Sequence, residues 1–105
     1  PGDILICRNS DRRKGPHPCF TPEGAVWLRD LEVKMVGIGT DFSLGATLTA
    51  SRAFHDILMA RDVCLVEFLS NLGELRRNEF FFMALPFKCA QIDSAPARAI
   101  AIEER

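Results

Sequence analysis

The sequence has little net charge, no long apolar run and little basic or apolar character in its first residues. Its 105 residues carry a formal net charge of −1, which gives no reason to expect a polyanionic partner such as nucleic acid. No apolar stretch approaches the roughly 20 residues that span a bilayer. The first residues also lack the basic start and apolar stretch of a signal peptide. We therefore expect neither a nucleic-acid-binding protein nor a membrane protein.

The chain also lacks an initiator methionine and any CxxC pair. By number alone, the four cysteines permit a disulfide framework. However, Cys7 and Cys64 stand in apolar, strand-like runs, so a reduced, cytoplasmic protein with mostly buried thiols fits better. The missing methionine suggests a processed product or a trimmed piece of a longer chain, beside the alternative of a natural short protein.

What the chain does contain is enough apolar material for a core. Hydrophobic residues make up 48% of it and charged residues 26%, the balance of a globular domain rather than of a disordered tail. The length predicts a single domain over residues 1–105 or a fragment of a larger one.

Strand and helix patterns alternate along the sequence. Thr21-Pro22-Glu23 predicts a helix start, because Thr can cap free amides, Pro tolerates the first turn and Glu favours the positive end of the helix dipole. Ser51 is a plausible cap for a second helix, whose apolar face carries Phe54. Apolar runs predict strands at residues 3–7, 33–38, 63–68, 80–87 and 97–102.

This order, β-α-β-α-β followed by two strands, predicts an α/β fold with a mainly parallel or mixed sheet and helices packed on it. Within the fourth strand, Phe80-Phe81-Phe82-Met83 is expected to belong to the core rather than to form a sticky surface.

Glu67 is the least expected residue of the sequence, because it lies in the apolar run Val63-Cys64-Leu65-Val66-Glu67-Phe68. Burying a carboxylate is costly unless it is paired, hydrogen-bonded or bound to a metal. His55 lies twelve residues earlier on the second predicted helix. A helix packs against the strand that follows it, so both side chains can face one crevice near the carboxyl end of the strand. An imidazole and a carboxylate are suitable metal ligands.

The spacing also allows a simpler interpretation, in which Glu67 has reached the solvated end of its strand and His55 lies on an exposed helix edge. His17 and Cys19 form a possible second ligand pair, but two ligands in a proline-rich loop do not close a tetrahedral shell. Residues 12–14, Arg-Arg-Lys, are able to bind phosphate but are usually just solvated in such a loop.

Several segments resemble, in order, the cyclase family of hydrolases, which includes bacterial kynurenine formamidases and isatin-hydrolase-like enzymes. The similarity is strongest in His55-Asp56-Ile57-Leu58 and in Val66-Glu67-Phe68-Leu69-Ser70-Asn71-Leu72, where the family shows a helical His and then E-x-L-x-N-L. The other matching segments are PGDILI at residues 1–6, TPEGAVWL at 21–28, VGIGTD at 36–41, ALPFK at 84–88 and SAPARAIAI at 94–102.

The resemblance implies a swivelling β/β/α arrangement, of which this chain is the C-terminal portion. It further implies that His55 and Glu67 are catalytic residues and ligands or close neighbours of a divalent metal, Zn²⁺ or Mn²⁺. The implied reaction is hydrolysis of an amide, formamide or lactam C–N bond in a small-molecule substrate.

Two departures from the family pattern limit this expectation. The family motif H-x-G-T-H-x-D, which supplies its principal metal ligands, is absent from the sequence, and Gly39 stands where many members have Asp. We expect the chain to be inactive without the missing N-terminal half and to pair with that half or form a homo-oligomer. A non-catalytic interaction or dimerisation module and an unrelated small α/β binding domain remain the alternatives.

Overall fold

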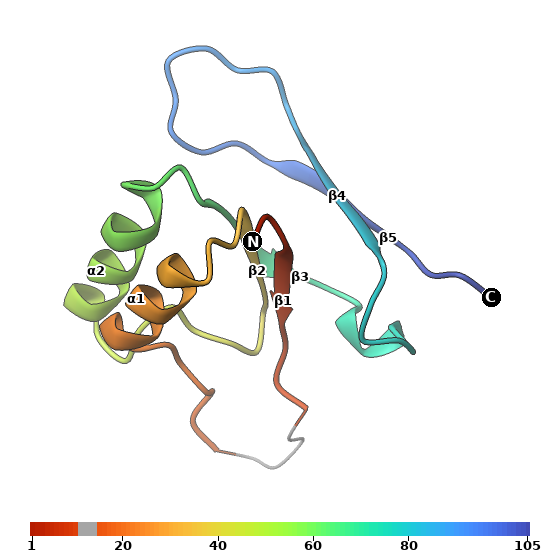
Figure 1. The fold of residues 1–105 in the computed structure, drawn as a ribbon, viewed down its shortest axis with the longest axis horizontal. Helices are drawn as coiled ribbons and strands as arrows, with labels where there is room; N and C mark the ends of the chain where they lie inside the picture. The colour runs from red at the N-terminus through yellow and green to blue at the C-terminus, as the bar shows by residue number, and fades with distance from the viewer. Residues whose placement is uncertain (11–14) are drawn as a thin grey trace. The chain divides into compact units, whose positions relative to one another are not determined.

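The computed structural model describes residues 1–10 and 15–105, so the basic residues 12–14 lie outside the described residues. Its elements follow the predicted order and form an α/β fold with two separate sheets (Figure 1). They are β1 (Ile4–Cys7), α1 (Pro22–Asp30), β2 (Met35–Gly39), α2 (Leu48–Met59), β3 (Cys64–Leu69), the 3₁₀ turn η1 (Leu72–Glu74), β4 (Phe81–Pro86) and β5 (Ala97–Ile102). The chain divides into two compact units, Pro1–Leu72 and Gly73–Arg105.

The first unit, hereafter the N-terminal unit, is built on a parallel sheet with the strand order β1-β2-β3. Helix α1 connects the first two strands and α2 the second and third, and both lie on the same face of the sheet (Figure 1). This is the geometry expected of two successive βαβ units. The predicted α/β fold is thereby confirmed.

The two helices begin at side-chain caps, one of which the sequence located correctly. Thr21 caps α1, with its hydroxyl accepting the Gly24 amide at 3.1 Å. Helix α2 begins earlier than predicted, because Thr47 and not Ser51 is its cap: the Thr47 hydroxyl accepts the Ala50 amide at 3.1 Å. The Ser51 amide already bonds the Thr47 carbonyl within the first turn, so the prediction of a cap at Ser51 was wrong.

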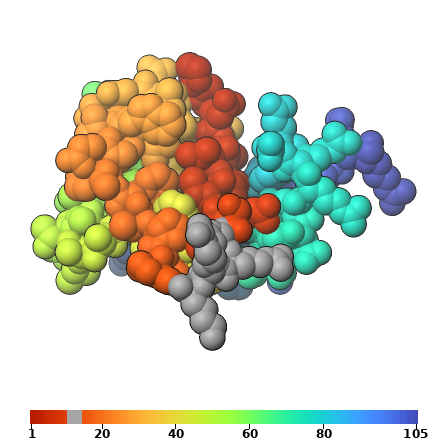
Figure 2. All heavy atoms as spheres, turned by 90° about the horizontal axis from the view of Figure 1, so that it is seen from below, coloured from red at the N-terminus to blue at the C-terminus, as the bar shows by residue number. Residues whose placement is uncertain are grey.

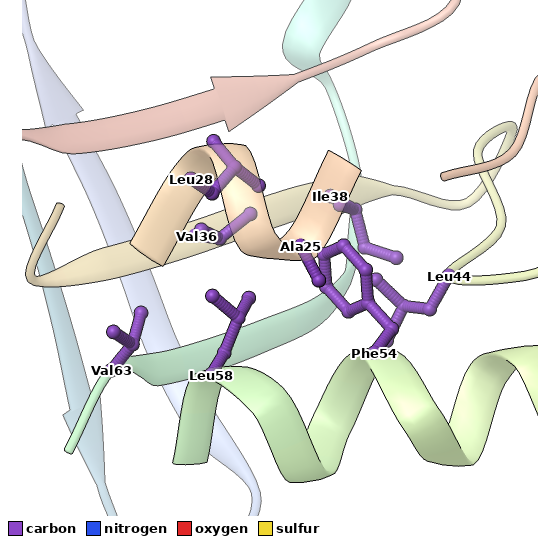
Figure 3. Close-up of a cluster of buried hydrophobic side chains, with 8 residues drawn as sticks. All are labelled: Ala25, Leu28, Val36, Ile38, Leu44, Phe54, Leu58 and Val63. Atoms are coloured by element: carbon purple, nitrogen blue, oxygen red, sulfur yellow. The ribbon is translucent and has the colours of Figure 1, made fainter. Parts of the chain in front are cut away.

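The core of the N-terminal unit lies between the helices and the sheet (Figure 3). Phe54 and Leu58 of α2 are fully buried, as the predicted apolar face requires. The Phe54 ring stacks on Phe20 with a centroid separation of 4.8 Å. The buried cluster comprises Ala25, Leu28, Val36, Ile38, Leu44, Phe54, Leu58 and Val63. In the space-filling view, the segments of this unit pack as one continuous body (Figure 2).

The four cysteines all lie within the described residues, and none is paired. The expectation that most thiols are buried was wrong, because Cys19, Cys64 and Cys89 are exposed. Leu65 of β3 packs against the core, so strand alternation directs the neighbouring Cys64 to the opposite face of the sheet. An apolar run therefore did not ensure burial. Cys7 is half-buried, and burial raises the pKa of its thiol.

The second unit, hereafter the C-terminal unit, is a two-stranded antiparallel ribbon in which Phe81 pairs with Ile102 and Pro86 with Ala97. The Glu103 carboxylate accepts the backbone amides of Arg76 and Arg77, at 2.9 and 2.7 Å. No helix in the described parts of either unit is long and apolar enough to cross a membrane.

The expectation that residues 80–83 are core was wrong. Phe81 is 60% exposed, and the other three are only partly buried. A two-stranded ribbon has no second layer of its own to cover its apolar side chains, which a local run of phenylalanines does not reveal.

Candidate functional site

His55 is held in one orientation by its own helix. It lies on α2 beside the buried Phe54, and its Nδ1 is 2.7 Å from the carbonyl oxygen of Ser51, one helical turn earlier. A carbonyl oxygen only accepts hydrogen bonds, so Nδ1 carries the proton and donates it. The sequence analysis did not identify this contact, although the four-residue spacing on a helix was the available signal. The other ring nitrogen, Nε2, is therefore free of its own helix and is directed toward groups outside α2.

Glu67 of β3 is the group that Nε2 faces. Its Oε2 lies 3.6 Å from His55 Nε2, and the two side chains are 31% and 37% exposed. The structure thus brings together the two residues singled out from the sequence. Partial exposure leaves the pair within reach of a small molecule or an ion from solvent.

The protonation pattern makes this pair a site for positive charge. In a neutral His55 with its proton on Nδ1, Nε2 bears a lone pair, and the Glu67 carboxylate is also an acceptor. Two acceptors that face each other need a shared partner: a water molecule that donates to both, a proton on Nε2, which gives an ion pair, or a metal ion that both atoms bind.

The geometry fits two ligands of one metal ion. Donors about 2.0–2.1 Å from a tetrahedral ion lie roughly 3.4 Å from each other, close to the observed 3.6 Å. A backbone carbonyl that receives the Nδ1 proton is also the usual support for a metal-binding histidine. However, the described residues contain no group of three or more His, Cys, Asp or Glu side chains that could hold a metal. The pair therefore offers two ligands, and a closed site needs more.

The other candidate ligand pair does not form a site. His17 and Cys19 are both exposed, and Cys19 forms an isolated parallel bridge with Ser43. Backbone hydrogen bonds hold this segment: the Phe20 amide donates to the Ser43 carbonyl, and the Ser43 amide donates to the Pro18 carbonyl, each at 3.0 Å. The structure assigns the segment a role in supporting the loop after β2.

Polar contacts fasten the loops at the carboxyl ends of the strands, a feature that the sequence analysis missed. After β1, Arg8 Nη1 donates to the Leu72 carbonyl at 3.0 Å, and the Asn9 amide donates to Asp41 Oδ1 at 3.3 Å. Asp41 had no assigned role in the sequence, and here it links the loops that follow β1 and β2. Ligands of parallel α/β sheets bind at this edge of the sheet.

The sequence is similar to those of curated bacterial kynurenine formamidases. It is 31% identical to the enzyme of Delftia acidovorans (strain DSM 14801 / SPH-1) over 81 residues. It is 29% identical, over the same length, to the enzymes of Bordetella avium (strain 197N) and Bordetella petrii (strain ATCC BAA-461 / DSM 12804 / CCUG 43448). These matches confirm the predicted relationship to cyclase and kynurenine formamidase-like proteins.

The relationship covers part of each protein. The matched segment is 77% of this chain and 38% of each relative. No protein-family model matches the chain, and no solved structure does.

Proposed function

We propose that the chain is the C-terminal part of a metal-dependent hydrolase that acts on an amide, formamide or lactam C–N bond of a small molecule. The observation that carries the proposal is the contact between His55 Nε2 and Glu67 Oε2 at 3.6 Å. The similarity to kynurenine formamidases supports the reaction class. The unpaired cysteines are compatible with a reducing compartment such as the cytoplasm.

In this proposal, His55 and Glu67 hold a divalent ion, Zn²⁺ or Mn²⁺. His55 contributes the Nε2 lone pair, and its hydrogen bond to the Ser51 carbonyl keeps the ring from rotating. Glu67 contributes negative charge. When bound, a divalent ion lowers the pKa of its water and polarises the scissile carbonyl.

The number of ligands limits what the chain does alone. Catalytic zinc sites use three protein ligands, and the described residues place two together. The remaining ligands therefore come from outside the described residues, and the isolated chain is inactive toward an arylformamide. An assay for release of the arylamine from an arylformamide, in the presence of Zn²⁺ or Mn²⁺, measures this activity directly. If the isolated chain turned over the substrate and lost that activity when His55 or Glu67 was changed, the proposed inactivity would be contradicted.

The metal site itself is tested by titrating the ¹⁵N-labelled chain with Mn²⁺, which broadens the NMR signals of nearby nuclei. We expect broadening centred on His55 and Glu67, and its loss in the His55→Ala/Glu67→Ala double variant. A His17→Ala/Glu79→Ala variant removes one histidine and one glutamate at exposed positions and should broaden like the parent. Broadening centred elsewhere, or its absence at His55, would overturn the assignment.

A second candidate function is a dimerisation module, favoured by the exposed apolar side chains of the C-terminal unit. The register places Phe81, Leu85, Ile100 and Ile102 on one face of the ribbon, and each is 39% to 60% exposed. Such a stripe is suited to an equivalent stripe on a second copy of the chain. Analytical ultracentrifugation should then show a dimer that Leu85→Glu dissociates. A parent chain that stays monomeric at all concentrations would exclude this function.

A further inference from the structure

Strand β3 contains a bulge directly after Glu67. Gly37 pairs with Val66 and Gly39 with Leu69. Two residues separate Val66 from Leu69, Glu67 and Phe68, whereas Ile38 alone separates the partners on β2. The strand therefore carries one residue more than its neighbour, and Phe68 is that residue. We call this feature the Phe68 bulge.

The Phe68 bulge changes the face to which β3 directs its side chains. Leu65 packs against the core on the helix side, and Glu67, two residues later, reaches His55 of α2 on the same side. Leu69 would follow them in a regular strand. Instead, it is buried outside that core.

The Leu69 side chain occupies the space that a side chain at Gly37 would fill. A Cβ atom on Gly37 would lie 2.8 Å from Leu69 Cδ1 and 2.6 Å from Ile6 Cδ1. Gly37 stands between Val36 and Ile38, which both face the helices, so this space is on the opposite side of the sheet. The bulge thus makes Glu67 the last side chain of β3 on the helix side, with no apolar group following it.

Phe68 occupies this position at a conformational cost. Its φ is 60°, in the left-handed region that bulky residues avoid. Its side chain is 76% exposed, so burial does not offset the cost. Strain of this kind persists where the surrounding structure imposes it, and bulges beside functional sites re-aim side chains.

We propose that Phe68 is a positioning residue, whose left-handed backbone directs Leu69 away from the helix side and holds the Glu67 carboxylate against His55. Only the functional meaning of the pair rests on the proposed hydrolase function. The conformational claim concerns β3 and its contact with His55 of α2, and it is independent of any bound metal.

The test compares two substitutions at one position. Phe68→Gly retains the left-handed conformation at lower cost, whereas Phe68→Val places a β-branched residue where it is least tolerated. Each variant is made with and without Glu67→Gln. The ¹⁵N shifts of the His55 ring are measured at one fixed pH, in metal-free protein, with His17 as the internal reference and core methyl signals as a check of folding.

In the parent and in Phe68→Gly, Glu67→Gln should move the His55 Nε2 signal. In Phe68→Val the same change should have no effect, because the carboxylate no longer faces the ring. Loss of the response in folded Phe68→Gly would overturn the proposal, as would a full response in folded Phe68→Val. If the valine variant does not fold, Phe68→Ala takes its place, with a partial loss expected and an undiminished response overturning the proposal.

A second measurement separates this inference from the proposed function. Where the parent binds Zn²⁺, Phe68→Val should weaken binding by about 10-fold or more, the usual effect of disturbing the support of a metal ligand. Phe68→Gly should leave the affinity unchanged. A parent that binds no Zn²⁺ but shows the predicted shift pattern refutes the metal site and sustains the positioning role.

Discussion

The N-terminal and C-terminal units differ in how their side chains are shielded from water. In Pro1–Leu72, nine of the described apolar residues are buried, four of them with no exposed surface. In Gly73–Arg105, all of which the structure describes, no residue is buried. The first unit is therefore stabilised by packing, and the second by backbone pairing and a few side-chain hydrogen bonds. Since such bonds exchange against bonds to water, each contributes modestly to stability.

The candidate site lies on the unit that has the buried core. His55 projects from the helix that carries Phe54 and Leu58, both fully buried. Glu67 projects from a strand paired along β2. Sites on packed helices and strands keep their geometry better than sites on loops. The exposed apolar ribbon is instead a surface whose stability depends on what covers it.

The largest expected effect on stability comes from a substitution in the core of the N-terminal unit. Phe54→Ala should destabilise the chain by about 3–5 kcal/mol, because it leaves a cavity under Phe20. Phe87→Ala, at a residue that is 70% exposed, should stay within about 0.5 kcal/mol of the parent. Urea unfolding followed by circular dichroism measures both. Similar costs for the two variants would mean that the ribbon carries as much packing energy as the core.

A smaller effect is expected where backbone packs against backbone. A Cβ atom on Gly45 would lie 2.7 Å from the Ala50 carbonyl carbon and 2.9 Å from Ser51 Cα. Gly45→Ala should therefore cost about 1–3 kcal/mol, as overpacking does. Gly15→Ala is the matched control, because nothing lies within 4 Å of its Cβ position. Equal stability of the two variants would show that the loop before α2 moves away freely.

Much of the fold was predictable because local patterns carry it. Strand and helix alternated with the expected periods, and Thr21 lay before the proline and glutamate that mark a helix start. The second helix start was misplaced because Thr47 and Ser51 are equally able to cap. Gly45 lies against Ala50 and Ser51 in the first turn, a tertiary contact that local sequence does not reveal. The exposure of residues 80–83 also depends on tertiary structure, because a two-stranded ribbon has no second layer of its own to cover them.

The candidate site was predictable in part. A carboxylate in an apolar run and a histidine on the preceding helix were sufficient to single out Glu67 and His55. Their separation of 3.6 Å could not be predicted, because the Phe68 bulge shifts the strand and no glycine in the sequence indicates a bulge at this position. A left-handed phenylalanine contradicts local preference, and such contradictions are seen only in the structure. Among the described residues, no third His, Cys, Asp or Glu side chain joins the pair in a group that could hold a metal ion.

The two possible caps of α2 give a test of about 1 kcal/mol. Thr47→Ala should destabilise the N-terminal unit by about that amount, because the Ala50 amide loses its acceptor. Ser51→Ala should cost less, and the His55 ring should keep its signal, since its partner is the Ser51 backbone carbonyl. Thermal unfolding compares the two variants. A larger cost for Ser51→Ala would restore the cap that the sequence suggested.

The smallest expected effect is local to the C-terminal unit. Glu103 accepts the amides of Arg76 and Arg77, so Glu103→Ala should speed their hydrogen exchange by about twofold to fivefold, as the loss of modest, partly solvated bonds predicts. Glu104→Ala, which changes the neighbouring exposed glutamate, should alter neither rate. Amides of β2 should exchange as in the parent, because both bonds to Glu103 join residues of the C-terminal unit. Faster exchange of the β2 amides as well would mean that the two units unfold together, and the contrast in packing would then not be a contrast in stability.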